Sequence, residues 1–203
     1  MSRGVRTVLG LLCIARAVFA QDARLSARLD KPTLAAVTAI VDSARVSKLP
    51  TAPLIDKALE GVAKGSDGET IIIAVHLLSA RMGSAKRALA SNPTPDEISA
   101  AASAMDVGIS ARDLAKLRAA AGKRTLTQPL AVLTDLVGQK VPIPTATDLV
   151  LQLARGGVKD PDLVLFQRNV RADVDHGADP TVAATTRTRG LVARGGPPAK
   201  PSE

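Results

Sequence analysis

The chain has 203 residues, a formal net charge of +8 and a hydrophobic content of 46%, with no tryptophan, no tyrosine, two phenylalanines and one cysteine. This length suits one compact domain, and a core of alanine and aliphatic side chains favours closely packed helices. The scarcity of aromatic rings excludes a nucleic-acid surface that depends on base stacking, and a single cysteine excludes a disulfide framework.

The first twenty residues have the pattern of a signal peptide. Arg3 and Arg6 precede an apolar run over residues 7–15, and Ala20 lies where a signal peptidase cleaves. The run is shorter than the roughly 20 apolar residues that span a bilayer. We therefore predict cleavage after Ala20 and a periplasmic or secreted protein, the alternatives being a buried N-terminal helix or an uncleaved anchor.

Cleavage at this point changes the chemistry that remains. Cys13 and Phe19 leave with the signal peptide, so the mature chain has no thiol and Phe166 is its one aromatic residue. Thiol nucleophiles, thiolate metal sites and disulfides are thereby excluded. Cleavage also removes part of the positive charge. The basic residues that remain are interspersed with acidic ones, as on an ordinary solvated surface.

Residues 21–30 are predicted to be a flexible N-terminal segment, and residues 31–176 a helical domain. Caps, early prolines and glycine stops predict eight helices. Thr94 and Glu97 form a capping box, in which each side chain accepts from the other's backbone amide. The predicted helices cover about 31–47, 52–64, 67–90, 94–105 and 110–122, with three more that start at Thr127, Pro144 and Asp160.

Two parts of this domain resemble each other. Residues 48–78 align with residues 140–170 at a constant offset and without a gap. Identical pairs include Lys48 with Lys140 and Gly65 with Gly157. Short-linked helices that each have one apolar face must pack on their neighbours. The prediction is therefore an all-α fold of short antiparallel helices, arranged as a compact helical array or a short α-solenoid with an internal repeat. The alternative to a true duplication is convergence, because any helical hairpin favours similar caps and glycine stops.

The pattern changes after His176. Residues 177–203 contain Asp179-Pro180, paired glycines and prolines, and scattered basic residues. Such a composition offers little to bury, so these residues are predicted to form a disordered basic tail.

Few residues are candidates for chemistry. His76 lies in an apolar stretch, which favours a buried or half-buried structural histidine over a general base. The segment from Asp173 through His176 to Asp179 brings acids and an imidazole close together, yet it matches no calcium loop and is interpreted as a helix end with solvated acids. Gly122-Lys123-Arg124-Thr125 lacks the upstream glycine of a phosphate loop. We therefore predict no catalytic, metal-binding or cofactor-binding residue.

These observations lead to a functional hypothesis. We expect an exported bacterial helical-repeat protein that is not an enzyme and that serves as a binding or scaffold module for a partner in the envelope or outside the cell. Neither nucleic acid nor an integral membrane segment is expected in the mature chain. The alternatives are a protein whose basic tail contacts an anionic cell-surface polymer and, third, a hydrolase-type enzyme that uses His76.

Overall fold

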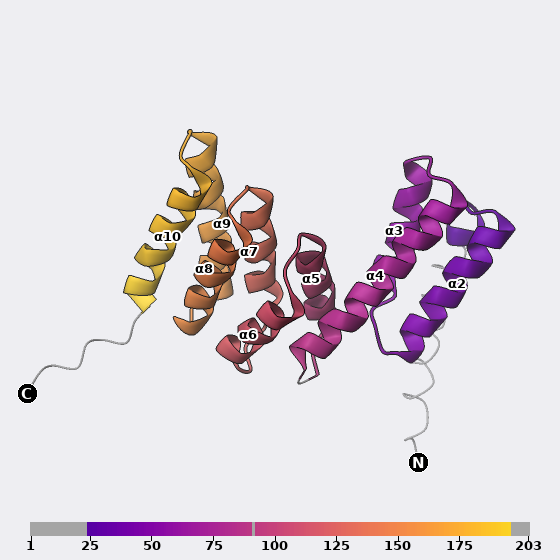
Figure 1. Cartoon of the computed structure of the whole chain (residues 1–203), viewed down its shortest axis with the longest axis horizontal. Coiled ribbons are helices and arrows are strands. Elements are labelled where there is room, and N and C mark those ends of the chain that lie inside the picture. The colour runs from indigo at the N-terminus through magenta and orange to yellow at the C-terminus, as the bar shows by residue number, and fades with distance from the viewer. Residues whose placement is uncertain (1–23, 91, 196–203) are drawn as a thin grey trace, which may run out of the picture. The chain divides into compact units, whose positions relative to one another are not determined.

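The computed structural model describes residues 24–90 and 92–195, which contain nine helices, labelled α2 to α10, and no strand (Figure 1). The all-α prediction is confirmed. Residues 1–20, predicted to be a signal peptide, lie outside the described residues. The chain divides into two compact units, unit 1 up to Ala80 and unit 2 from Arg81, and the division falls inside helix α4 (Gly68–Leu89).

Unit 1 contains α2 (Lys31–Val46), α3 (Ala52–Ala63) and the first part of α4. Asp30 caps α2 as predicted, because its side chain accepts from the Thr33 amide at 2.8 Å. Within residues 21–30, predicted to be flexible, residues 24–26 are helical, and Leu25 is buried and accepts the Leu29 amide at 2.9 Å. The core of unit 1 consists of Leu25, Val37, Val41, Ala44, Leu54, Ile55, Ala58, Ile71 and Val75.

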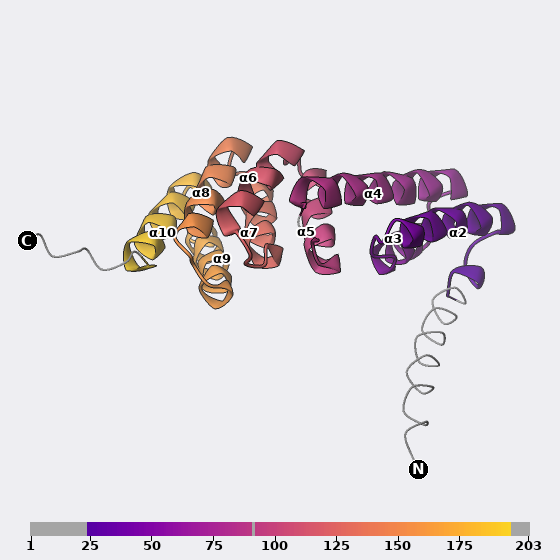
Figure 2. The same cartoon turned by 90° about the horizontal axis from the view of Figure 1, so that it is seen from below.

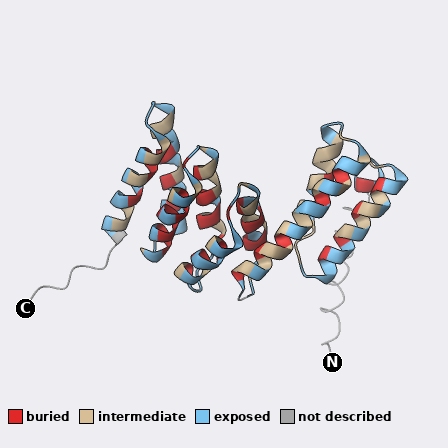
Figure 3. Cartoon of the chain, viewed as in Figure 1, coloured by how far each residue is buried: buried red, intermediate tan, exposed pale blue. Residues whose placement is uncertain are grey.

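Unit 2 continues α4 and adds six helices in two rows. Helices α5 (Pro95–Asp106), α7 (Thr127–Gly138) and α9 (Asp160–Asp175) pack successively in one row. Helices α6 (Ala111–Ala121), α8 (Ile143–Arg155) and α10 (Pro180–Gly195) form the second row (Figure 2). Each helix of the two rows has buried residues (Figure 3). This packing of each helix on its second neighbour is that of a short solenoid.

The predicted disorder of residues 177–203 is wrong for residues 180–195, which form helix α10. Asp179 accepts the Val182 amide at 2.9 Å, and Pro180 occupies the first turn, where a missing N–H costs nothing. Ala183, Ala184 and Thr188 are buried. Asp179-Pro180 is therefore a helix start and not a breaker, and residues 196–203 lie outside the described residues.

A buried carboxylate joins three elements of unit 2. The predicted capping box of Thr94 and Glu97 is present, with distances of 2.9 and 3.2 Å. Glu97 also accepts from the Leu126 amide at 2.9 Å, at the start of α7, and from Arg118 of α6 at 3.0 Å. The side chains of Glu97 and Arg118 are only 5% and 14% exposed. Burial favours a higher pKa for Glu97, but the two amides and Arg118 outweigh it and the pKa is lowered.

Arg118 and Arg124 extend this network. Arg118 also donates to the Arg124 carbonyl, and Arg124 donates to the Ala154 carbonyl at the end of α8. The network therefore connects α5, α6, α7 and α8 through charged hydrogen bonds, which are about twice as strong as neutral ones.

We expect Glu97→Ala to destabilise the protein by about 3–5 kcal/mol, because it leaves Arg118 buried without its anion. Urea denaturation measures the loss. Asp96→Ala, at an exposed acid in the same first turn, should cost less than about 1 kcal/mol. Equal losses in the two variants would show that Glu97 is an ordinary surface cap.

The same carboxylate predicts a pH dependence. Because the folded-state pKa of Glu97 is lowered, its contribution is present above the unfolded-state pKa, near 4.3, and is lost as the pH falls through the folded-state value. The free energy of unfolding should therefore fall as the pH decreases below about 5. Glu97→Gln should reduce the slope of this fall, and an unchanged slope would contradict the assignment.

The two aligned segments share their turn geometry. Lys48 and Lys140 have φ of 53° and 74°, and Gly65 and Gly157 have φ of 70° and 69°. After the lysines, the Leu49 amide donates to the Ala44 carbonyl at 2.9 Å and the Val141 amide to the Leu136 carbonyl at 3.0 Å. Each helix therefore ends on a left-handed residue that closes its last turn.

Gly157→Ala should destabilise the protein by about 1 kcal/mol, since a Cβ is strained in the left-handed region. No atom lies within 4 Å of a Cβ built there, so the cost is purely conformational. Gly138→Ala is the matched control, because its Cβ also meets nothing and its φ is not positive. Thermal unfolding should give a lower Tm for the first variant only.

Candidate binding groove

A groove of about 500 Å³ lies in unit 2 between the start of α9 and the second half of α10. The left-handed Gly157 ends α8 and directs the chain through Lys159 into α9. A second left-handed glycine, Gly177, ends α9 and returns the chain as α10. The groove therefore lies between two helices, α9 and α10, each of which follows a turn at a left-handed glycine.

The wall of the groove combines apolar and basic side chains. Leu165 and Leu191 line it, together with Phe166, which is almost fully buried. Lys159 and Arg194 supply positive charge at one end. Asp162, Asn169 and Arg187 complete the polar lining. Such a wall suits a ligand that has both an apolar and an anionic part.

The charges of the groove are not equally available. Arg187 donates twice to Asp173, at 2.8 and 2.7 Å, and this pair lowers the pKa of Asp173 and raises that of Arg187. Arg194 donates through Nε to the Gly190 carbonyl at 3.0 Å. Within residues 24–90 and 92–195, neither Lys159 nor Arg194 forms an ion pair. Two cations are therefore available to an incoming anion.

His76 differs from its prediction. The structure places it exposed on α4, whereas a buried or half-buried histidine was expected. Val75, its neighbour in the sequence, takes the inward position, because neighbouring residues on a helix point about 100° apart. His76 is not among the residues that line the groove.

The residues from Asp173 to Asp179 have separate local roles. Asp173 pairs with Arg187, and His176 contacts the Ala172 carbonyl through Nδ1 at 2.6 Å. Asp179 caps α10. Across the described part of the chain, no three His, Cys, Asp or Glu side chains lie together as a metal site requires.

Two glycine-containing stretches of unit 2 lie at helix ends. Gly122 ends α6 with φ of 62°, and Arg124 bonds to main-chain carbonyls, including that of Ala121 at 3.3 Å. Gly156 is the cap of α8, and Gly157 follows it. Both stretches therefore have a structural explanation.

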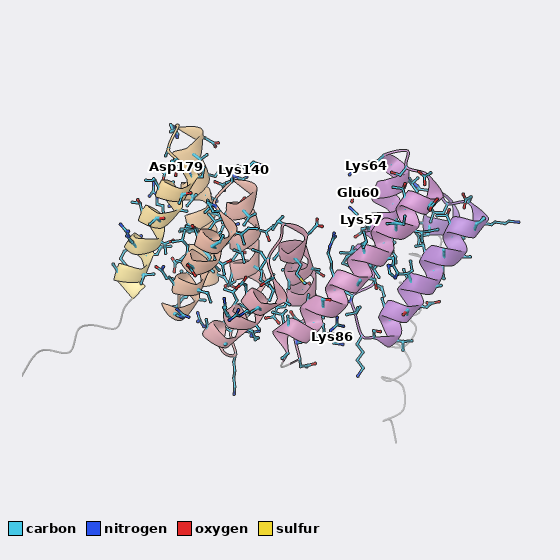
Figure 4. The ribbon with its side chains drawn as sticks, viewed as in Figure 1. Lys57, Glu60, Lys64, Lys86, Lys140 and Asp179 are labelled. Atoms are coloured by element: carbon cyan, nitrogen blue, oxygen red, sulfur yellow. The ribbon has the colours of Figure 1, made fainter. Side chains whose placement is uncertain are left out.

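Helix α3 has a cluster of charged side chains that pair with one another. Lys57, Glu60 and Lys64 lie on one side of the helix (Figure 4), and Lys57 donates to Glu60 at 3.0 Å. The bonds from Lys64 and Lys57 lower the pKa of Glu60 to about 2. All three side chains are at least 39% exposed, as is common for a solvated i, i+3 and i, i+4 network.

Sequence reasoning missed the groove because α10 was not predicted. A detectable signal was present: Asp179-Pro180 is followed by Ala183, Ala184, Thr188 and Leu191 at helical spacing. Lys159 and Arg194, in contrast, have no local signature. Only the packing of α10 against α9 brings them together.

Comparisons with known proteins give no family for this chain. No protein-family model, curated protein or solved structure matches it. Among the helices of the described residues, none combines the length and apolar character that crossing a bilayer requires.

Proposed function

We propose that this protein is an exported binding module, not an enzyme, and that its α9–α10 groove holds an acidic segment with apolar side chains from a partner in the envelope or outside the cell. The observation that carries the proposal is that Lys159 and Arg194 line the groove beside an apolar wall, and neither forms an ion pair with another described residue. Export rests on the predicted signal peptide, residues 1–20.

The groove supports binding more than catalysis. Its lining contains no histidine, serine, threonine or cysteine, so the hydroxyl–histidine or thiol–histidine pair of many hydrolases does not line it. His76 is exposed and does not line the groove, which weakens the hydrolase alternative. Rigid helices that hold two cations beside Leu165 and Leu191 are what a preorganised peptide site requires.

The anionic-polymer alternative differs in the surface it needs. A polymer would contact exposed basic residues of α10 without regard to the groove, and Arg189 is such a residue. A partner segment would depend on Lys159 and Arg194, which line the groove. Charge reversal at these positions therefore separates the two functions.

We expect a photo-crosslinking residue at Leu165 to capture one defined protein in the producing cell. Lys159→Glu with Arg194→Glu should lower this capture at least tenfold, because two attractive charges become repulsive. Arg189→Glu, a single exposed charge reversal on the same helix outside the groove, is the control and should leave it unchanged. Capture of glycan or lipid alone, reduced equally by Arg189→Glu, would replace the proposal by the polymer function.

A further inference from the structure

The residues that line the α9–α10 groove lie on one stripe of each helix. They are Asp162, Leu165, Phe166 and Asn169 on α9, and Arg187, Leu191 and Arg194 on α10. Side chains three, four and seven positions apart share one face of a helix, so the groove runs along the two helix axes. Each stripe covers about 10 Å of its helix, or two turns.

The main chain of the groove wall is largely bonded already. Beyond the first turn of α9, both helices bond their amides and carbonyls internally. In the turn before α9, the amides of Gly156, Gly157 and Val158 donate back to carbonyls of α8, at 2.8, 3.2 and 3.2 Å. An extended segment would therefore leave the main-chain groups on its inner side without partners, which weakens binding. A helix bonds its own main chain and presents only side chains to the wall.

The two ends of the groove differ in charge. Lys159 directly precedes α9 and Arg194 lies in the last turn of α10, and because the two helices are antiparallel both cations lie at one end (Figure 1). Asp162, in the first turn of α9, offsets part of this charge. Farther along the groove, Arg187 is paired with Asp173. The net positive charge is therefore concentrated where α9 begins.

This difference favours one direction for a bound helix. A helix has a partial negative charge of about half a unit at its C-terminus and a similar positive charge at its N-terminus. With its C-terminus beside Lys159 and Arg194, the helix dipole and any carboxylates in the last turn are attracted together. In the opposite direction, the positive end of the dipole would be repelled by the same cations. The first direction is therefore the more stable one.

We propose that the α9–α10 groove binds an amphipathic helix of the partner protein, antiparallel to α9 and with aspartate or glutamate in its last turn. Its apolar residues, three and four positions apart, pack on Leu165, which is 49% exposed, and on the half-buried Leu191. Its acidic residues lie beside Lys159 and Arg194. This rests on the function proposed above, which places an acidic segment in the groove and leaves its conformation and direction open.

A second copy of this chain is a poorer source of such a helix. Among the helices of residues 24–90 and 92–195, α5 and α9 end on an aspartate, Asp106 and Asp175. The apolar side of each is already buried, with Ile98 on α5 and with Leu163 and Val170 on α9. Neither helix can enter the groove of another molecule without leaving its own unit.

The test is a selection from a displayed library of random peptides of about 16 residues, carried out on the full-length mature chain. Peptides are retained only if they fail to bind Lys159→Glu with Arg194→Glu and still bind Arg189→Glu, at an exposed arginine outside the groove. We expect the retained peptides to have apolar residues at intervals of three and four, with acidic residues on the C-terminal side of these.

The retained peptide that binds most tightly is then synthesised with a fluorescent label, and its Kd is measured by anisotropy. A proline in the middle of its apolar stretch should raise the Kd at least tenfold, because proline interrupts a helix. Transfer of its acidic residues to the N-terminal end should raise the Kd at least threefold. In the protein, Leu165→Asp should raise the Kd at least tenfold, and Arg189→Glu should leave it unchanged.

The possible results distinguish this inference from the function proposed above. If no peptide requires Lys159 and Arg194, both fail together. Peptides that require these two residues but have alternating apolar residues, or acidic residues on the N-terminal side, would overturn the helix or its direction and leave the groove as the binding site. Self-association of the wild-type chain in sedimentation velocity, abolished by Lys159→Glu with Arg194→Glu, would make a second copy the ligand and would also overturn the inference.

Discussion

The buried carboxylate of Glu97 is the interaction on which the packing of unit 2 depends. A chain with so few aromatic residues has only aliphatic contacts to fix the angles between its helices, and such contacts are not directional. The Glu97 side chain adds direction, because it accepts from two amides in different elements and from Arg118. Because the site is buried, these hydrogen bonds are stronger than they would be in water. For the same reason, a polar group left without its partner there would destabilise the fold.

The same hydrogen-bond network also fixes the next helices of unit 2. Arg124 donates to the carbonyl of Ala154, so the α6–α7 connection is also linked to the end of α8. Gly157, which closes α8 soon after this carbonyl, then sets the direction of α9. The position of Lys159 in the groove therefore follows from a series of polar contacts at helix ends, with the aliphatic core filling the space between the rows.

The two similar parts of the chain differ at one helix end. Where Gly177 ends α9, α10 folds back and forms a basic groove with Lys159 and Arg194. Ala85 lies at the equivalent position, and α4 continues through it to Leu89. One position, glycine in one part and alanine in the other, thus accompanies the difference between a helix that ends and a helix that continues.

Local signals in the sequence determined the helices α2 to α9, the capping box of Thr94 and Glu97, and the turns at Gly65 and Gly157, because caps and stops act on neighbouring residues. They also contained α10, although Asp179-Pro180 was interpreted as a break. The division inside α4 had no signal, since the helix crosses it without a stop. The exposure of His76, the bonds from Arg118 and Leu126 to Glu97, and the meeting of Lys159 with Arg194 were decided by tertiary structure alone. Each of these depends on which helix packs against which. The residues that meet are 20 to 35 positions apart in the chain, and local sequence patterns do not indicate such contacts.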